Sequence, residues 1–432
     1  MYFAILFVLR LLGPLLGFAM ASFCLKYFEN PFDDPGYGPD DPRWVGAWWI
    51  GFVLEGFLLL LVAIPISMFP KMPPGVKKPI NRPETDKRVN FSGMFAALKR
   101  VLLNSLLWVI MVNDIISLYG TVGHHIMLPK YMEHQFRLTA SDASLYSGVP
   151  GLAAVMVSVL LGGYLVWKFR PTVKFLFGSM IVLEVIGACG FLILMIPKCE
   201  KLEMAYFGME DDGLILEGSC NMNCNCSRKS FTPVCGSDLR TLYFSPCYAG
   251  CEKSLNKTFF NNCSCIPELG NFEKYATEGF CMPESCWQQA LTYIIAWPTI
   301  QFIVSLLRVM QQVLLLRCTQ HQDKSLALAM FEGITVVLGI VPYLVIFGSM
   351  VDSACLVFES SCEETGNCWF YDTDKLNNIL HGMSAGFSFL SVGTMYLLYT
   401  MRDRFSDMYE EDIFNEEKKD VDENPDAKKA DE

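Results

Sequence analysis

Long apolar segments constrain what this chain can fold into more than any other feature of its sequence. A helix that crosses a lipid bilayer needs about 20 mostly apolar residues in a row. Only 18% of the 432 residues are charged, whereas soluble domains carry about 25%. The sequence therefore predicts an all-α polytopic membrane protein with eight spans, near residues 3–26, 45–69, 104–128, 144–167, 175–197, 287–314, 326–350 and 378–400.

Basic residues in the loops predict how these spans are oriented. Residues 70–103 carry eight lysines and arginines, and only Glu84 and Asp86 oppose them. Such loops stay on the cytoplasmic side of a membrane. Alternation from this loop places both termini in the cytoplasm and puts four loops outside, residues 27–43, 129–143, 198–286 and 351–377. Cleavage of residues 1–26 as a signal peptide is the alternative for the N-terminus, and it leaves the other orientations unchanged.

Cysteines gather in two of the loops that the basic residues place outside. Eleven of the 17 cysteines fall between Cys199 and Cys286, and three more lie between Cys355 and Cys368. Dense clusters of this kind are typical of disulfides in an oxidising compartment, and we expect no metal site. The residues that we expect in disulfides are Cys220, Cys224, Cys226, Cys235, Cys247, Cys251, Cys263, Cys265, Cys281 and Cys286.

Three N-x-[ST] sequons in the larger cysteine-rich loop predict glycosylation at Asn225, Asn256 and Asn262. Asn256 is the strongest of the three, because the other two sequons have cysteine in the middle position. Asn90 also lies in a sequon, but the loop that contains it is predicted to be cytoplasmic. We therefore expect Asn90 to stay bare.

Polar residues recur at helical spacing on three of the predicted spans. The stripes are Asp114, Ser117, Thr121 and His125 on the third span, Gln301, Ser305, Arg308 and Gln312 on the sixth, and His381, Ser384, Ser388 and Ser391 on the eighth. Because polar groups at bilayer depth are costly, the stripes predict a shared water-filled cavity. Hydrogen bonding inside a closed bundle is the alternative. Candidate residues of a transport path are Asp114, His124, His125, Gln301, Arg308, Glu332 and His381.

Small residues mark other helix faces. One seam contains Gly13, Gly17 and Ala21, and another contains Ser147, Gly151, Ala154, Ser158 and Gly162. Seams of this kind let helices approach closely. Pro150, Pro298 and Pro342 interrupt predicted helices, as the moving helices of transporters often do, although static kinks explain each one equally well.

The stretch DPRWVGAWWIGF, residues 41–52, stands at the entrance to the second span. Its tryptophans suit the boundary between membrane and water. The stretch resembles the signature D-x-R-W-[IV]-G-A-W-W-x-G-[FL]-L of the organic anion transporting polypeptides, and Val53 is a mild departure at the last position. The matching residues are Asp41, Arg43, Trp44, Gly46, Trp48, Trp49 and Gly51.

The larger cysteine-rich loop carries a second resemblance. The order of cysteines from Cys224 to Cys251 is similar to that of a Kazal-type module, with one extra residue between Cys235 and Tyr243. In Kazal modules the first cysteine pairs with the fifth, the second with the fourth and the third with the sixth. Extra cysteines leave open which six residues of this loop follow that order.

The family resemblance implies a major facilitator-type bundle of twelve spans in two six-helix halves. This chain resembles spans five to twelve, so eight of the twelve spans are present. A fragment, a mispredicted start and a truncated isoform are all open explanations. On this basis residues 1–69 hold two spans of the N-terminal half, 70–103 a cytoplasmic linker, 104–197 and 287–400 three spans each of the C-terminal half, 198–286 the extracellular Kazal-like loop, and 401–432 a disordered acidic cytoplasmic tail.

The same resemblance implies a function. Family members carry amphipathic organic anions across the plasma membrane by alternating access, without sodium and with exchange for bicarbonate or another internal anion as one mode. Their cargo includes steroid conjugates, bile-salt-like compounds, prostanoids and thyroid hormones. Two alternatives stay open for this chain, a transport-inactive fragment or isoform and a membrane-tethered Kazal-type inhibitor of serine proteases. We expect no enzymatic activity and no cofactor, because no nucleotide-binding loop or catalytic motif occurs in the sequence. We expect no nucleic-acid partner, because the chain without its acidic tail is nearly balanced in charge.

Several residues acquire roles from the resemblance. Lys130 matches a basic position that the family uses in handling substrate. Many members have an arginine in the eleventh span, where this chain has Val336, with Glu332 one turn earlier. The departure reduces the number of cations expected in the cavity. His124 and His125 predict that transport depends on pH, and replacement of both by glutamine would abolish this dependence. The acidic tail predicts either a solvated segment or a contact with a cytoplasmic scaffold.

Overall fold

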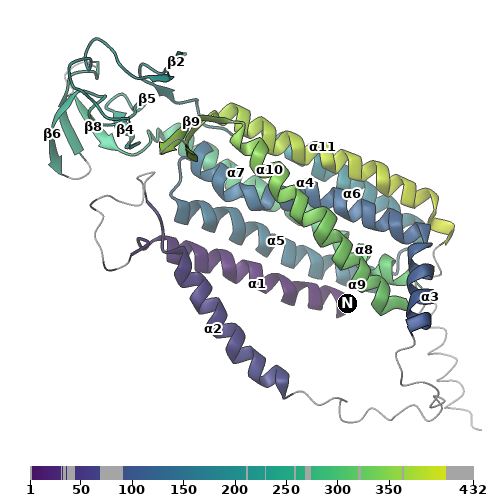
Figure 1. Ribbon diagram of the computed structural model, residues 1–432. Helices are drawn as coiled ribbons and strands as arrows, with labels where there is room; N and C mark the ends of the chain where they lie inside the picture. Colours follow the sequence, from purple (N-terminus) through teal and green to yellow (C-terminus); the bar gives the residue numbers. More distant parts are fainter. Residues whose placement is uncertain are drawn as a thin grey trace, which may run out of the picture.

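The computed structural model describes residues 2–30, 32, 36, 44–68, 91–210, 213–228, 230–256, 259–267, 274–319, 323–361 and 364–404. Within that part, long helices lie side by side, and a small β-rich module covers one end of the bundle (Figure 1). Asp41, Arg43 and Asn90 lie outside the described residues, as do most of the predicted linker and of the acidic tail.

Helices account for every predicted span. They are α1 (Tyr2–Leu25), α2 (Trp48–Ser67), α3 (Phe91–Leu102), α4 (Ser105–Gln135), α5 (Ala140–Phe169), α6 (Val173–Ile193), α7 (Glu284–Val304), α8 (Arg308–Arg317), α9 (Lys324–Ile334), α10 (Val341–Asp352) and α11 (Thr373–Thr400). A 3₁₀ turn, η1 (Ser305–Leu307), joins α7 to α8, and a π-helical turn, η3 (Thr335–Ile340), joins α9 to α10. Helix α3 was not expected and lies in the predicted linker.

Seven helical segments of the described chain are long and apolar enough to cross a membrane, and α9 with α10 counts as one of them, as does α7 with α8. The eighth predicted span corresponds to α11, a continuous helix of 28 residues whose polar face makes it less apolar. Helix α11 packs between α4 and α6. Its crossing of the membrane stays a prediction.

Two large buried clusters hold most of the helices together, and a smaller cluster of Ala4, Val155, Val159 and Val309 joins α1 to α5 and α8. The cluster nearest the β-rich module contains large aromatic side chains, among them Tyr131, Tyr293, Trp297, Tyr343 and Phe347. The cluster toward the opposite end is mainly aliphatic and contains Leu107, Met111, Phe177, Leu314 and Met395. Burial of a side chain of this size stabilises a fold by about 1.5–3 kcal/mol in water. Inside a membrane, the association of helices depends more on close van der Waals contact between them.

The tryptophan-rich signature forms a clasp between α1 and α2. Trp44 Nε1 donates to the Leu25 carbonyl at 3.0 Å, and Trp49 Nε1 donates to the Glu29 carbonyl at 2.8 Å. A Cβ atom at Gly46 would lie 2.6 Å from the Leu25 Cα atom, so only glycine fits there. The described part of the signature therefore holds the end of α1 against the beginning of α2.

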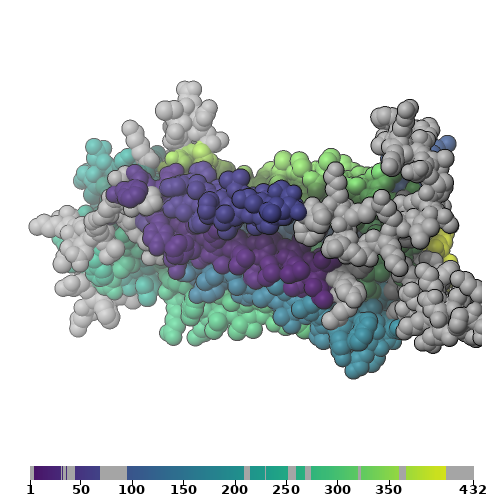
Figure 2. Space-filling model, turned by 90° about the horizontal axis from the view of Figure 1, so that it is seen from below, coloured from purple at the N-terminus to yellow at the C-terminus, as the bar shows by residue number. Residues whose placement is uncertain are grey.

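Helix α2 lies at the edge of the bundle. None of its side chains is buried within the described part of the chain, and it packs mainly against α1. Trp48 is exposed and packs edge-on against Phe52, while Gly51 faces Met20 of α1. Figure 2 shows α1 and α2 together on one face of the molecule.

The β-rich module contains a six-stranded sheet in the order β1-β5-β4-β8-β7-β6. Only β1 and β5 are paired in parallel; the other neighbours are antiparallel. The strands are β1 (Glu203–Met204), β4 (Val234–Gly236), β5 (Thr241–Tyr243), β6 (Cys251–Asn256), β7 (Phe259–Cys263) and β8 (Tyr275–Glu278). Two separate hairpins are formed by β2 (Gly208–Glu210) with β3 (Gly213–Ile215) and by β9 (Cys355–Ser361) with β10 (Glu364–Tyr371).

The module packs on the hairpin that joins α10 to α11. The ring of Phe231 stacks on Trp369 of β10 with centroids 5.9 Å apart, and Phe244 meets the same indole edge-on. Val357 and Phe370 of the hairpin belong to the same buried cluster. The two cysteine-rich loops, which are far apart in the sequence, therefore form one continuous structure.

Six disulfides lie within the described residues: Cys199–Cys286, Cys220–Cys265, Cys226–Cys247, Cys235–Cys281, Cys251–Cys263 and Cys355–Cys368. Residues 220, 226, 235, 247, 265 and 281, taken in order, pair first with fifth, second with fourth and third with sixth. This is the order that the resemblance to a Kazal module implies, although the relationship itself stays a prediction. Cys199, Cys355 and Cys368 add bonds at the base of the module and in the hairpin.

The prediction of a disulfide at Cys224 was wrong. This thiol is free and exposed within the described structure, because Cys226 takes the nearby partner Cys247. Cys362 lies outside the described residues. Asn225 and Asn262 are exposed and have positive φ values of 49° and 58°. Asn256 is the last residue of strand β6. Glycosylation of the three asparagines stays a prediction.

The unequal status of neighbouring cysteines leads to a testable expectation. The double substitution Cys226→Ser with Cys247→Ser opens a loop that spans 21 residues, and we expect it to lower the free energy of unfolding by about 3 kcal/mol. Cys224→Ser is the matched control and should leave it unchanged. Thermal unfolding of the purified protein in detergent measures both. Equal midpoints for the two variants would contradict the pairing.

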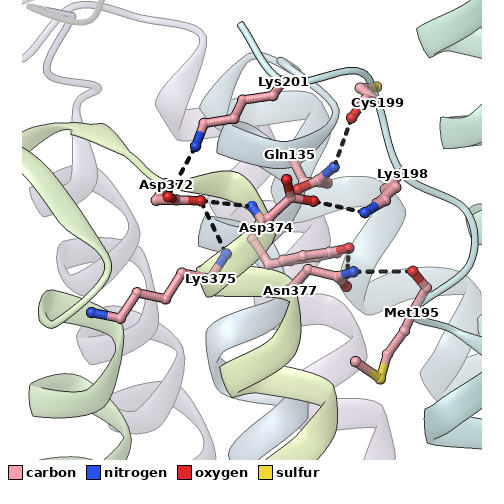
Figure 3. Close-up of polar contacts among 10 residues, drawn as sticks. Gln135, Met195, Lys198, Cys199, Lys201, Asp372, Asp374, Lys375 and Asn377 are labelled. Atoms are coloured by element: carbon pink, nitrogen blue, oxygen red, sulfur yellow. Dashed lines mark hydrogen bonds and ion pairs between the residues drawn. The ribbon is translucent and has the colours of Figure 1, made fainter.

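Polar contacts fasten the base of the module to the beginning of α11 (Figure 3). Lys201 Nζ lies 3.1 Å from an Asp372 oxygen, and Lys198 Nζ lies 2.7 Å from Asp374. Asn377 Nδ2 donates to the Met195 carbonyl at 3.0 Å. The end of α6, the chain that enters the module and the start of α11 are therefore held together.

Asp372 also caps α11 and makes the stability at this junction depend on pH. Partial burial alone would raise the pKa of Asp372, but the backbone N–H of Lys375 and the ammonium of Lys201 lower that pKa overall. A carboxyl group with a lowered pKa in the folded state stabilises the fold above its unfolded pKa, about 4, and this contribution is lost as the pH falls through the folded pKa. The junction should therefore weaken only in acid.

We expect Asp372→Ala to destabilise the protein by about 1 kcal/mol at pH 7, as the loss of an N-cap does. The difference from the unmodified protein should shrink at pH 3, because this pH lies below the unfolded pKa, where part of the stabilisation by the charged carboxylate is already lost. Unfolding midpoints at the two pH values measure the effect, with Glu203→Ala on the exposed edge of the module as the control. A difference that stays equal at both pH values would refute the role of the charge.

Candidate functional site

A polar cavity lies inside the bundle between α4, α6, α11 and the junction of α7 with α8. It contains about 600 Å³ of space not occupied by atoms, including its open end. Polar lining residues are Ser117 and Thr121 of α4, Glu184 of α6, Gln301, Arg308 and Gln311 of α7 and α8, and Ser388 of α11. Apolar lining residues include Met180, Leu183, Phe191, Ile300, Val304 and Leu307. All three predicted polar stripes contribute to this cavity.

Arg308 is positioned by a break in its helix. Residues Ser305–Leu307 form the 3₁₀ turn η1, and Arg308 begins α8 directly after it. Arg308 Nη2 donates to Thr121 Oγ1 at 3.4 Å, while the Thr121 hydroxyl donates to the Ser117 carbonyl at 2.8 Å. The guanidinium is therefore oriented by a neighbouring helix and still faces the cavity with its other N–H groups.

The same break explains a difference from the predicted stripe. Gln312 was expected on the cavity face, but Gln311 lines the cavity instead. A 3₁₀ helix turns about 20° more per residue than an α-helix, so three residues of η1 advance the helix face by roughly 60°. That advance brings Gln311 into line with Gln301 and rotates Gln312 away from it.

Glu184 is a cavity residue that the sequence interpretation missed. It lines the cavity from α6, beside Ser391 of α11, and interacts electrostatically with Arg308. A signal for it exists, because Glu184 is the only charged residue in the apolar segment 175–197. Ionisable residues at bilayer depth usually serve a function. Glu184 belongs to no polar stripe, because it has no polar neighbours at helical spacing.

A second polar cluster lies nearer the module and is completely buried. Tyr293 Oη is 3.0 Å from His381 Nε2 and 3.3 Å from His124 Nε2. Asn377 accepts a hydrogen bond from Tyr131 Oη through its side chain, and its backbone carbonyl is 3.0 Å from His381 Nδ1. Tyr131, Tyr293 and Asn377 were not predicted. Two histidines that were predicted from separate helices therefore share one tyrosine hydroxyl.

Trp297 connects this histidine cluster to the cavity region. Its ring stacks on His124 with centroids 4.4 Å apart and meets His125 edge-on at 4.8 Å. Gly151 of α5 lies against the indole, where a Cβ atom would come within 2.8 Å of Trp297 Nε1. The small-residue seam of α5 thus makes room for a large aromatic side chain of α7.

Several buried polar atoms near these clusters have no hydrogen-bond partner within the described structure. They are His124 Nδ1, Trp297 Nε1, Gln301 Nε2, Ser305 Oγ, Thr335 Oγ1 and Ser384 Oγ, among others. An unpaired buried polar group costs about 1–3 kcal/mol. Gln301 lines the cavity, so a polar ligand or water there would remove part of this penalty.

The structure does not bring the remaining predicted residues into the cavity. Lys130 lies at the module end of α4, with Nζ 5.0 Å above the ring of Tyr371. Glu332 pairs with Arg10 of α1 at 3.6 Å. Asp114 interacts electrostatically with Arg308 and Glu332 and lines a narrower adjoining space with Gln311. Among the described residues, no group of three or more His, Cys, Asp or Glu side chains could hold a metal ion.

Comparison with known proteins gives a consistent picture. A family model described as Organic Anion Transporter Polypeptide (OATP) family matches residues 1–376. The chain is 31% identical to solute carrier organic anion transporter family member 74D of Drosophila melanogaster, over 90% of this chain and 49% of that protein. It is also 31% identical to member 4C1 of Homo sapiens, over 88% and 56%, and 29% identical to member 1B2 of Rattus norvegicus, over 86% and 60%. The chain therefore spans about half to three fifths of the length of these relatives.

Proposed function

The chain belongs to the organic anion transporter polypeptide family, and we propose that its central cavity is the cargo path of a membrane carrier for amphipathic organic anions. The similar proteins are solute carrier transporters and not enzymes. The observation that carries the proposal is the position of Arg308, the one cation among the described residues of a cavity wall that also carries one carboxylate, Glu184, and is otherwise lined by apolar and neutral polar side chains.

The chemistry of the cavity fits such cargo. The guanidinium of Arg308 offers N–H donors in a planar fork that suits carboxylate, sulfate or phosphate groups. Met180, Leu183, Ile300 and Val304 provide an apolar surface for a hydrocarbon skeleton. We therefore propose steroid conjugates and bile-salt-like, prostanoid or thyroid-hormone-like anions as the cargo class.

We propose alternating access without sodium coupling, with exchange for an internal anion as one mode. Breaks in the helices around the cavity support a path that opens and closes. Pro298 lies inside α7, η1 interrupts it before α8, and the π-helical turn η3 interrupts the next helical pair. Such breaks are common in transporter helices at substrate sites.

The disulfide-rich module supports an orientation with that module outside the cell and both termini in the cytoplasm. Disulfides form and persist in oxidising surroundings, and the basic loop of residues 70–103 favours the opposite side. We propose the plasma membrane as the location. The pH dependence through His124 and His125 and a scaffold contact of the tail both stay predictions.

A protease inhibitor is the less favoured function. An inhibitory Kazal loop between Cys226 and Cys235 would have to enter a protease cleft. Phe231 is instead buried and stacks on Trp369 of the neighbouring hairpin. Phe231 is therefore unavailable for contact with a protease. A transport-inactive fragment or isoform is the other alternative, and the first experiment tests it directly.

Uptake of a fluorescent steroid sulfate tests the proposal in cells that express residues 1–432. We expect saturable uptake in sodium-free medium that exceeds uptake by untransfected cells, with arrival at the surface measured by biotinylation. Replacement of sodium should change the rate by less than about twofold, because a carrier that is not coupled to sodium gains no driving force from its gradient. If the protein reaches the cell surface but no uptake is measured, the result would favour a transport-inactive fragment or isoform.

A further inference from the structure

The central cavity contains one positive and one negative side chain among its described lining residues. Arg308 enters from the start of α8, and Glu184 enters from α6. The two interact electrostatically, but within the described residues no direct ion pair joins them. Gln301, Ser117 and Ser388 supply neutral polar groups between apolar walls. The cavity therefore presents one group that suits an anion and one group that suits a cation or a hydrogen-bond donor.

A carboxylate on this wall needs an explanation. In surroundings of low polarity a charged group is stable only when it is paired or well hydrogen-bonded. Ser391 lies beside Glu184, yet its hydroxyl also points toward Asn113 Oδ1 at 3.4 Å. Arg308 directs one N–H toward Thr121. Both charged groups consequently keep hydrogen-bonding capacity that a molecule in the cavity can use.

We propose that Glu184 determines cargo specificity by accepting a hydrogen bond from a donor group on the same molecule whose anionic group binds Arg308. The preferred cargo is then an amphipathic anion that also carries an ammonium or hydroxyl group, separated from the anion by an apolar skeleton. This inference rests on the proposed function, because it concerns the same cavity. It goes further by naming the chemistry of the second recognition group.

The alternative role of Glu184 is purely electrostatic. In that case the carboxylate only weakens the field of Arg308, and its removal strengthens the binding of every anion to a similar extent. A specificity role has a different signature. Removal of the negative charge then weakens only those ligands that carry a donor, and it leaves anions without a donor unchanged or slightly stronger.

Direct binding to the whole chain separates these roles without requiring transport. The protein, residues 1–432, is placed in lipid nanodiscs, and dissociation constants are measured for three steroid sulfates that differ only at the far end of the skeleton. The far group is a ketone, a hydroxyl or an amine. Glu184→Gln keeps the shape of the side chain and removes its charge. Glu203→Gln, on the exposed edge of the module, is the matched control.

We expect Glu184→Gln to weaken binding of the amino steroid sulfate by about tenfold, since hydrogen bonds to charged groups contribute about that much. Binding of the keto compound should change by less than about twofold, and the hydroxy compound should lie between them. The control variant should behave like the unmodified protein. Equal changes for all three compounds, or no change for any, would overturn the specificity role of Glu184.

The variant Arg308→Gln separates failure of this inference from failure of the proposed function. If Arg308→Gln weakens all three ligands while Glu184→Gln shows no preference among them, the anion site stands and only the role of Glu184 is refuted. If the unmodified protein binds none of the three, or Arg308→Gln has no effect, the proposed cargo path fails and the inference fails with it.

Discussion

Replacement of Arg308 by glutamine is expected to reduce uptake of a steroid sulfate by about 30-fold or more. The guanidinium is the only positive side chain among the described residues that line the central cavity. A charge-assisted hydrogen bond to an anion contributes about 2 kcal/mol or more when water is largely excluded. Arg308→Lys keeps the charge without the planar fork, so it should retain an intermediate rate.

Uptake at several concentrations, divided by the amount of protein at the cell surface, measures this effect. Arg240→Gln is the control, because Arg240 is an exposed residue of the disulfide-rich module. Its rate should equal that of the unmodified protein. Normal uptake by Arg308→Gln at normal surface levels would show that the anion does not pass this guanidinium, and the proposed path would then be wrong.

Replacement of Gly162 by alanine is expected to destabilise the protein by more than about 4 kcal/mol. A Cβ atom at this position of α5 would overlap the carbonyl oxygen of Leu306 in η1. The obstacle is backbone and not the end of a flexible side chain, so the helices would have to separate. Effects of this size arise from severe overpacking and not from ordinary surface changes.

Gly178→Ala in α6 is the matched control, because a Cβ atom there meets nothing within 4 Å. The two variants are compared by thermal unfolding in detergent. The loss of monodisperse protein in size-exclusion chromatography measures the unfolding. Gly178→Ala should unfold at or slightly above the temperature of the unmodified protein. A similar midpoint for Gly162→Ala would mean that α5 and η1 do not pack as closely as described.

The two substitutions address different properties of the same region. Gly162 lets α5 approach η1, and η1 sets the position at which Arg308 begins α8. Loss of the close approach should therefore also reduce uptake. Loss of Arg308 alone should leave the unfolding midpoint nearly unchanged. Measurement of both properties for both variants separates a defect in cargo binding from a defect in helix packing.

The small-residue seam of α5 shows how far sequence patterns reach. The spacing of Ser147, Gly151, Ser158 and Gly162 predicts that one face of the helix is closely packed, and the structure places α7 and η1 against it. The pattern does not identify the neighbour. Gly151 accommodates the ring of Trp297, which lies on a helix more than 100 residues later in the chain.

The cavity residues show the same limit. The stripes on the third, sixth and eighth predicted spans contain Thr121, Gln301, Arg308 and Ser388, all of which line the cavity. Glu184 stands alone in its span and therefore belongs to no stripe. Lys130 lies instead at the end of α4 over the ring of Tyr371.

Composition, local charge and a long motif by themselves determined the membrane class, the helical segments, the family and the presence of a cysteine-rich module. These properties depend on residues that are close together in the sequence, so no knowledge of helix rotation is needed. The tertiary structure decided which polar groups meet. It moved the cavity face from Gln312 to Gln311 through the extra turn of η1, joined His124 to His381 through Tyr293, and left Cys224 unpaired. Each of these outcomes depends on the relative rotation and spacing of distant segments, which packing alone fixes.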